Sequence, residues 1–485
     1  MNRVEKILQY GEGNFLRAFV DWMVDILNEQ TDFNGSVAIV QPISRGLADL
    51  ITAQDGVFTT VLRGVQNGEA VETYRKITSV SRCLNPYEEK QFNAYRELGR
   101  SSDLRFVVSN TTEAGIAYHQ EEYTPQTMQA SFPANVAALL YDRYTHTEGD
   151  YSKGLVFIPC ELIDKNGELL KEYVLKHAKA WNLEAGFFDW IEEACDFTNS
   201  LVDRIVPGYP HQEEQAIWEK IGWEDKLIVS GEIFHLWVIE SKKGGYEKEL
   251  PFNQAGLNVI WTDDMSFYRT RKVRILNGAH TMSVHSAYQA GLDTVQECIA
   301  DTNLLLPFMN QGIFDEIIPV MEGDSEDLIA YAKDVLERFE NPFNPHQLLS
   351  ITLNSISKFK TRNLPSLLAF VEKRQALPKI LTFSLASLIA FYEATEYEGS
   401  ALKGKRNGET YLIQDDASVL AFFKEAYSHE GSVEERAHLL SRKTLANTDF
   451  WDQDLTKVAG LAELVETYLT RIWSDGMKSA LEVLV

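Results

Sequence analysis

A lysine, an asparagine and a histidine near the middle of the chain carry the functional groups of an acid–base site. They are Lys272, Asn277 and His280, in a segment whose apolar periodicity over 273–289 predicts a half-buried helix. On an α-helix, positions five and eight apart lie within about 60–140° of the first, so the three side chains can share one rim. A desolvated lysine loses its proton more easily, and an amide and an imidazole beside it can hold a carbonyl or alkoxide oxygen. These are the functional groups of a metal-free dehydrogenase, although the spacing alone favours a surface helix with a capping Asn277.

No metal-binding pattern is visible in the sequence. His285 follows His280 by five residues, but neither an HExxH nor a CxxC motif accompanies the pair. The four cysteines are scattered without metal-like spacing, at Cys83, Cys160, Cys195 and Cys298. We therefore predict that no metal takes part. A reduced, cytoplasmic compartment fits these cysteines.

Length and charge limit the class of protein. A chain of 485 residues is long enough for two or three domains with substantial cores. The formal net charge of -25 argues against a nucleic-acid partner or an anionic membrane, although a local pocket can still be basic. Residues 1–10 lack the apolar core of a signal peptide, and no apolar run approaches the length of a membrane span.

The hydrophobic pattern predicts an α/β fold with two domains. In the first half, short apolar strands alternate with helical segments, which indicates a doubly wound, Rossmann-like parallel sheet over 1–264. From 265 to 485 helical periodicity dominates, so we predict a mainly α-helical second domain that begins with the Lys272 segment. The predicted strands are 6–10, 37–40, 105–109, 154–158, 227–229 and 234–239. The predicted helices are 15–29, 273–289, 325–338, 367–374, 382–394, 418–425 and 461–473.

A glycine turn after the first strand predicts a dinucleotide site. Gly11 and Gly13 permit close backbone approach to a pyrophosphate at the N-terminus of the next helix, although Leu16 stands where the usual fingerprint has its third glycine. The residues proposed to bind the cofactor follow the first strand and the strand 105–109, whose carboxyl ends share one edge of the sheet. They are Gly11, Gly13, Asn14, Phe15, Arg17, Ser109, Asn110 and Thr111. A plain turn at Gly11 to Gly13 and a turn cap at Asn110 and Thr111 are the alternatives.

Several motifs together resemble the polyol-specific long-chain dehydrogenases, the mannitol dehydrogenase family. Lys-x4-Asn-x2-His is similar to the family's catalytic signature, and four further stretches are family-like in order and separation: 11–18, 55–59, 199–205 and 355–359. Residues 108–116 and 159–167 look like a subgroup that acts on keto-hexuronates. The resemblance implies Lys272 as acid/base and Asn277 and His280 as holders of the reacting oxygen. It also implies a protein that is a monomer or a weak homo-oligomer.

The resemblance implies NAD as cofactor. The second strand ends in Gln41 without the carboxylate that usually binds the ribose hydroxyls, and Arg45 could either meet a 2'-phosphate or be a solvated loop residue. The resemblance predicts NAD, because the family members that this sequence resembles most use NAD. The expected reaction is the reversible reduction of D-tagaturonate to D-altronate. Fructuronate/mannonate or a mannitol-type polyol is the runner-up, and a non-catalytic dinucleotide-binding regulator is a third possibility.

Two departures from the family pattern bear on the substrate. Leu162 replaces an asparagine that helps to bind the reacting oxygen, and Asn166 either compensates or only forms a turn. Ser350 replaces an arginine of mannitol-type members, which weakens mannitol as substrate. The basic cluster of Lys358, Lys360 and Arg362 could bind a sugar-acid carboxylate or form a solvated face. The residues expected to bind substrate are Asn166, Asp203, Lys358 and Arg362.

Overall fold

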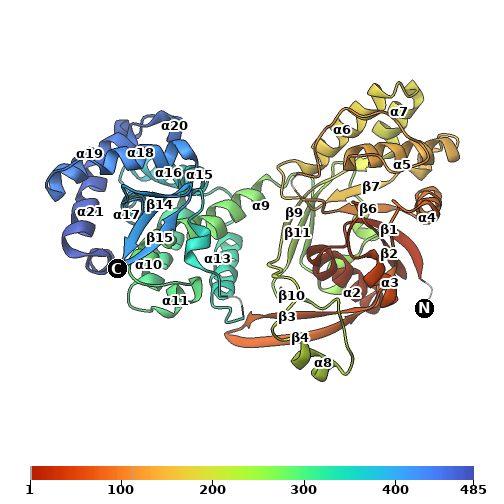
Figure 1. Ribbon diagram of the computed structural model, residues 1–485, viewed down its shortest axis with the longest axis horizontal. Helices are drawn as coiled ribbons and strands as arrows, with labels where there is room; N and C mark the ends of the chain where they lie inside the picture. The colour runs from red at the N-terminus through yellow and green to blue at the C-terminus, as the bar shows by residue number, and fades with distance from the viewer. Residues whose placement is uncertain (1–2, 113, 344) are drawn as a thin grey trace. The chain divides into compact units, whose positions relative to one another are not determined.

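The computed structural model describes residues 3–112, 114–343 and 345–485, so that residue 113 of the 108–116 motif lies outside the described residues. The chain divides into two compact units (Figure 1). The first contains the residues up to Gly64 together with Val71–Met265, and the second contains Val65–Ala70 and Ser266–Val485. No helix among the described residues is long and apolar enough to cross a membrane.

The first unit is built on a six-stranded parallel sheet, as the sequence predicts. Its strand order is β5-β2-β1-β6-β7-β8, and every neighbouring pair is parallel. In sequence order within this sheet, that is the 3-2-1-4-5-6 order of a dinucleotide-binding fold. The strands are β1 (Val4–Tyr10), β2 (Gly35–Val40), β5 (Val80–Leu84), β6 (Phe106–Ser109), β7 (Val156–Pro159) and β8 (Asp196–Phe197).

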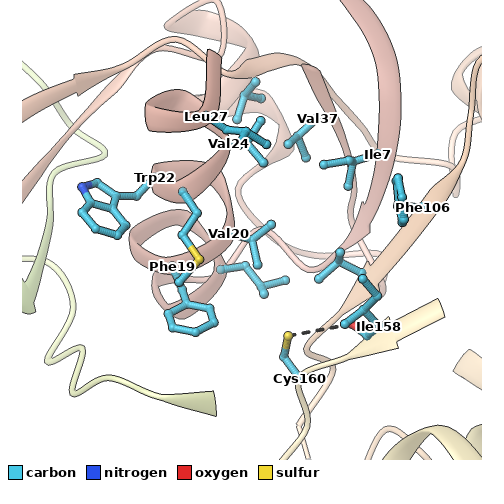
Figure 2. Packing of buried hydrophobic residues seen from close by; sticks show 14 of the residues in the cluster. Ile7, Phe19, Val20, Trp22, Val24, Leu27, Val37, Phe106, Ile158 and Cys160 are labelled. Atoms are coloured by element: carbon cyan, nitrogen blue, oxygen red, sulfur yellow. Dashed lines mark hydrogen bonds between the residues drawn. The ribbon is translucent and has the colours of Figure 1, made fainter. Parts of the chain in front are cut away.

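Helices cover both faces of this sheet, which explains why its strands are nearly continuous apolar runs. Successive residues of β1 contribute to opposite cores: Ile7 packs on one side and Leu8 on the other. Figure 2 shows the first core, where the helical segment through Phe19, Val24 and Leu27 packs against the sheet. The helices of the unit are α1 (Asn14–Leu16), α2 (Trp22–Gln30), α3 (Ala48–Ala53), α4 (Glu89–Arg100), α5 (Phe132–His146), α6 (Asn166–Ala180), α7 (Ala185–Ala194) and α8 (Glu214–Ile221).

The order of the strands reverses direction between β1 and β6, and the ends of these two strands are locked together. Tyr10 pairs with Val40 of β2 on one side and with Ser109 of β6 on the other. Beyond the strands, Gly11 N donates to the Val40 carbonyl at 3.1 Å and Asn110 N donates to the Tyr10 carbonyl at 3.0 Å. In an open α/β sheet this reversal opens the crevice where ligands bind.

Two smaller sheets lie in the first unit, except that Val65–Ala70, between and within β3 and β4, belong to the second. One contains β3 (Phe58–Gln66), β4 (Glu69–Ile77) and β10 (Val229–Glu232), and the other contains β9 (Asn199–Asp203), β11 (Leu236–Glu240) and β12 (Val259–Thr262). The strand predicted at 227–229 begins only at Val229. The Asp225 carboxylate accepts hydrogen bonds from Leu227 N at 2.8 Å and from Thr59 N at 2.6 Å, which turns the chain before the strand.

The second unit is mainly helical, as predicted, but it also holds a three-stranded antiparallel sheet that the sequence analysis missed. The sheet contains β13 (Tyr397–Glu398), β14 (Ala401–Arg406) and β15 (Glu409–Ile413). The helices of the second unit include α9 (Ser266–Arg271), α10 (Gly278–Gln289), α11 (Val295–Ala300), α12 (Leu305–Asn310), α13 (Ser325–Phe339), α14 (Leu348–Ile351), α15 (Ser355–Arg362) and α16 (Leu364–Arg374). Further along lie α17 (Lys379–Phe391), α18 (Ala417–Tyr427), α19 (Val433–Leu445), α20 (Thr448–Trp451), α21 (Leu461–Asp475) and α22 (Met477–Glu482).

Candidate active site

The glycine turn in the first unit has the geometry of a phosphate cradle. Gly11 has φ +121°, and a Cβ there would meet the Asn110 carbonyl oxygen at 3.0 Å, so this position requires glycine. Gly13 precedes the helical residues 14–30, and a Cβ there would have no neighbouring atom within 4 Å among the described residues. The space in front of Gly13 and the free N–H groups of the helix N-terminus therefore fit a dinucleotide pyrophosphate.

Arg17 lies in the interior of the first unit, which corrects the prediction that it binds cofactor. Its guanidinium is buried and donates to the Glu12 carbonyl at 3.1 Å, to Asn14 Oδ1 at 2.7 Å and to the Leu227 carbonyl. Arg17 and Asn14 are hydrogen-bonded to each other and support the glycine turn from the interior of the unit. The charge of Arg17 and the amide oxygen of Asn14 are therefore not directed to a ligand. Phe15 is half-buried and stacks on Phe19 with ring centroids 5.0 Å apart, which also makes it a packing residue.

Ser109 and Thr111 lie at the carboxyl end of β6, where the sequence places them, but their hydroxyls turn to a buried carboxylate. The Glu161 side chain accepts from Ser109 Oγ at 3.0 Å, from Thr111 N at 2.9 Å and from Thr111 Oγ1 at 3.0 Å. Burial raises the pKa of Glu161, although these donors oppose the shift. Glu161 therefore ties the ends of β6 and β7 together. Asn110 remains half-buried at this edge.

Asn166 is not available as a substrate ligand, which corrects the sequence-based expectation. Its side chain is fully buried, and its amide donates to the carbonyls of Pro159, Glu161 and Ser200 at 3.0–3.1 Å. Its oxygen accepts from the backbone N–H groups of Ser200 and of the following glycine. Every hydrogen-bonding position of the side chain is thus committed to holding β7 against β9.

Leu162 and Asp203, two further positions that the sequence analysis connects with substrate binding, differ in exposure. Leu162, which stands where the family has asparagine, is 67% exposed. Asp203 is buried at the end of β9.

In the second unit, a π-helical turn joins Lys272 to Asn277. The sequence predicts an uninterrupted α-helix, whereas residues Lys272–Asn277 form a π-turn between α9 and α10. In a π-turn the backbone hydrogen bonds join residues five apart, so Lys272 and Asn277 lie one turn apart on the same side of the helix. Both are half-buried, and the Asn277 side chain makes no capping hydrogen bond. The alternative of a capping asparagine is therefore wrong.

His280 follows on the first turn of α10 and presents a neutral imidazole. Its Nε2 is buried without a hydrogen-bond partner among the described residues. Burial lowers the pKa of His280 well below its ordinary value, and nearby cationic groups lower it further. The ring stacks on Phe339 with centroids 4.2 Å apart and meets the edge of His346 at 5.3 Å. An orphaned buried Nε2 in an aromatic setting is suited to bind a ligand oxygen.

His346 is a candidate that sequence reasoning missed. It is half-buried, and burial followed by the charge of Lys358 lowers its pKa. Only the tertiary fold brings it to His280, because it lies in the irregular segment between α13 and α14 and belongs to no motif.

Lys358 and Arg362 lie one turn apart on α15 and make no ion pair with a described residue. Lys358 Nζ donates to the Ile351 carbonyl at 2.8 Å, and Arg362 donates to Thr281 Oγ1 at 3.1 Å. Both are half-buried, and burial lowers the pKa of each. Lys360, in contrast, pairs with Asp452 at 2.7 Å and is not part of this pair of cations. Two partly desolvated cations that make no ion pair with a described residue can receive a carboxylate.

His285 has a different role from His280. Its Nε2 lies 2.7 Å from Ser355 Oγ, and that hydroxyl donates to the Thr352 carbonyl, so His285 is bound to the first residue of α15. Among the described residues no group of three His, Cys, Asp or Glu side chains could hold a metal ion.

Comparison with known proteins assigns the family. Residues 5–251 match the model of the mannitol dehydrogenase Rossmann domain, and residues 264–473 match that of the mannitol dehydrogenase C-terminal domain. The chain is 44% identical over 481 residues to the altronate oxidoreductase of Escherichia coli O139:H28 (strain E24377A / ETEC), covering 99% of this chain and 97% of the relative. Identity and coverage are the same for the altronate oxidoreductase of Shigella flexneri. The chain therefore belongs to the mannitol dehydrogenase family and is an oxidoreductase, which confirms the resemblance.

Solved structures show the same fold. A D-sorbitol dehydrogenase in substrate-free form superposes with a TM-score of 0.80 at 22% identity, over 99% of this chain and 95% of that chain. The Pseudomonas fluorescens mannitol 2-dehydrogenase, in ternary complex with NAD and D-mannitol, gives a TM-score of 0.67 at 21% identity, over 100% and 94%. The prediction of a Rossmann-like domain followed by a mainly helical one is thus confirmed.

Proposed function

We propose that this protein catalyses the reversible, NAD-dependent and metal-independent reduction of D-tagaturonate to D-altronate. The observation that carries the proposal is the full-length identity of 44% to altronate oxidoreductases. This protein also carries the lysine, the asparagine and the neutral histidine of the proposed acid–base site within three turns of one helical segment.

The first unit supplies the cofactor site in this proposal. Gly11 and Gly13 cradle the pyrophosphate at the helix N-terminus, and the edge formed by β1 and β6 receives the nicotinamide half. The relative from Pseudomonas fluorescens is a complex with NAD, which supports the same cofactor here. When bound, NADH supplies the hydride for the keto carbon of the substrate and NAD accepts it in the reverse direction.

The second unit supplies the proton in this proposal. Lys272 Nζ protonates the carbonyl oxygen while the carbon is reduced, and it takes the hydroxyl proton in the oxidation. Asn277 donates its amide hydrogen to the same oxygen. His280 stays neutral, so its Nε2–H tautomer can donate to the oxygen without competing for the proton that Lys272 carries.

The substrate's carboxylate is assigned to the cations of α15. Lys358 and Arg362 make no ion pair with a described residue, and burial has removed part of their hydration. A carboxylate placed between them would restore the lost stabilisation of both charges. Neutral fructose and mannitol offer no such group.

The proposal is tested by a substrate panel. NADH oxidation is measured with tagaturonate, fructuronate, fructose and, in the reverse direction with NAD, mannitol. We expect tagaturonate to have the highest kcat/KM. If fructuronate has the highest kcat/KM, the substrate pair is fructuronate and mannonate instead. If fructose has the highest kcat/KM, the uronate assignment is wrong and a mannitol-type activity takes its place.

Lys272→Ala tests the acid–base assignment separately. Removal of a general acid typically costs about 10²–10⁴-fold in rate, so kcat should fall by that amount. Binding of NADH, followed by its fluorescence, should remain nearly unchanged, because Lys272 is not part of the glycine turn. Turnover within a few fold of wild type would show that another group moves the proton.

A further inference from the structure

The helix that carries Lys358 and Arg362 has no N-terminal cap of its own. Asn354 precedes α15 with φ +54°, in the left-handed region, and its side chain makes no capping hydrogen bond although asparagine is a favoured capping residue. The four N–H groups at the start of a helix need partners from elsewhere when the local residue does not supply one.

Asp415, which follows strand β15, supplies the missing cap. Its carboxylate accepts from Ile356 N at 3.4 Å, and the neighbouring Gln414 carbonyl accepts from Asn354 N at 3.2 Å. The same Asp415 oxygen accepts from the Tyr392 hydroxyl. Tyr392 is fully buried and stacks on Phe423 with ring centroids 4.2 Å apart, so the carboxylate is held from the core side.

Asp415 is also the acidic group that acts on Lys358. Burial and the adjacent Arg362 lower the pKa of Lys358, whereas the charge of Asp415 raises it. Among the described residues the charge of Lys358 also acts on three imidazoles whose pKa values are lowered mainly by burial, so that they stay neutral: His280, His285 and His346.

We infer that Asp415 is a positioning residue for substrate recognition: it fixes the start of α15, and its carboxylate acts on the cation pair of this helix, which receives the substrate's carboxylate. The inference rests on the proposed function. It gives the antiparallel sheet β13–β15 a task, since this sheet ends in the segment that carries Asp415.

Two substitutions separate the two parts of this role. Asp415→Ala removes both the cap and the charge, and KM for tagaturonate should rise about tenfold or more at neutral pH because a charge-assisted contact is misplaced. Asp415→Asn keeps a capping oxygen but removes the charge. At low pH its KM should match that of wild type. As the pH is raised, KM should begin to increase at a lower pH than in wild type. At high pH the KM of the variant should exceed that of wild type about tenfold for each unit by which the pKa of Lys358 has fallen.

The readouts distinguish positioning from general damage. The KM for NADH and kcat at saturating substrate should change little in both variants. Glu316→Gln is the matched control: Glu316 is a buried carboxylate of the same unit that accepts from Ile380 N and Leu381 N at 2.8 Å each, at the start of α17. It should lower stability without changing KM for tagaturonate or its pH dependence. Equal KM changes for tagaturonate and neutral fructose in Asp415→Ala, or an unchanged pH profile in Asp415→Asn, would overturn the inference.

A measurement without substrate keeps the test independent of the proposed function. Lysines of the wild type and of Asp415→Asn are reductively methylated with ¹³C, and the Lys358 resonance is assigned by its loss in Lys358→Arg. Its titration midpoint should lie at lower pH in Asp415→Asn, and equal midpoints would refute the electrostatic role. A wild-type enzyme that reduces no keto-hexuronate would contradict the proposed function, and the NMR titration would still decide whether Asp415 controls Lys358.

Discussion

Replacement of Lys358 by methionine should impair the enzyme selectively toward substrates that carry a carboxylate. Lys358 is half-buried, its Nζ has one hydrogen bond to the Ile351 carbonyl at 2.8 Å, and it makes no ion pair with another described residue. Methionine keeps the length and apolar stem of the side chain, so the packing around α15 should survive. What is lost is the ammonium group that the proposal assigns to the substrate.

The size of the effect follows from the kind of contact. A hydrogen bond to a charged group contributes about 1.5–3 kcal/mol, which corresponds to roughly one to two powers of ten in affinity. We therefore expect KM for tagaturonate to rise by about 10- to 100-fold, with kcat at saturation within a few fold of wild type. KM for neutral fructose should change by less than about threefold, the equivalent of an ordinary neutral contact.

The assay is the initial rate of NADH oxidation over a range of tagaturonate and of fructose concentrations. Lys360→Met is the matched control, because Lys360 lies on the same helix but pairs with the exposed Asp452 at 2.7 Å, and an ion pair at the surface contributes about 0–1 kcal/mol. It should leave both KM values unchanged. If Lys358→Met impairs tagaturonate and fructose equally, Lys358 binds a hydroxyl common to both, and the carboxylate must be bound elsewhere, with Arg362 the next residue to test.

Three further predictions concern the cofactor, the pH dependence of stability and the metal. Gly13→Ala should leave the melting temperature nearly unchanged, because a Cβ there meets no described atom within 4 Å, yet raise the Kd for NADH in a fluorescence titration; a lower melting temperature with unchanged Kd would place the cofactor elsewhere. Burial lowers the pKa of His285 to about 3, so below pH ~6.5 the unfolded chain binds a proton that the folded chain does not, and stability should fall by about 1.4 kcal/mol per pH unit from this group. Urea titrations between pH 7 and 5 should show that slope reduced in His285→Gln, and equal slopes would contradict the assignment. Prolonged chelation should not change activity, because no metal-binding group of three side chains exists among the described residues, and activity lost with EDTA and restored by zinc or manganese would refute this.

Part of the fold could be predicted because short-range rules are enough to place it. The strands of the first unit are apolar runs since both sheet faces are covered, and the glycine turn directly follows the first of them. The hairpin between β14 and β15 could also have been predicted, because it turns at Asn407 and Gly408, a pair typical of two-residue turns with two positive φ angles. The helical character of the surrounding sequence concealed that signal.

Other residues could not be assigned from sequence because their roles depend on what they face. The motif predicts that Arg17 binds the cofactor, but its guanidinium donates to buried carbonyl groups inside the unit. The sequence suggests Asn166 as a replacement for the missing family asparagine, but its side-chain amide donates to three backbone carbonyl groups. A sequence pattern gives the chemical type of a side chain and does not give the direction in which it points.

The sequence by itself determined the fold class and the family, and it supplied the lysine, the asparagine and the histidine that we propose for the acid–base site, since periodicity and motif spacing are local properties of the chain. The tertiary structure decided how these groups are tuned. The π-turn brings Lys272 and Asn277 to one side of the helix, and burial beside Phe339 and His346 keeps His280 neutral. Asp415 caps the helix of Lys358 from a different sheet. Desolvation and the electrostatic field at a group are set by all the segments that fold around it, and these contacts between distant residues leave no pattern in the order of the amino acids.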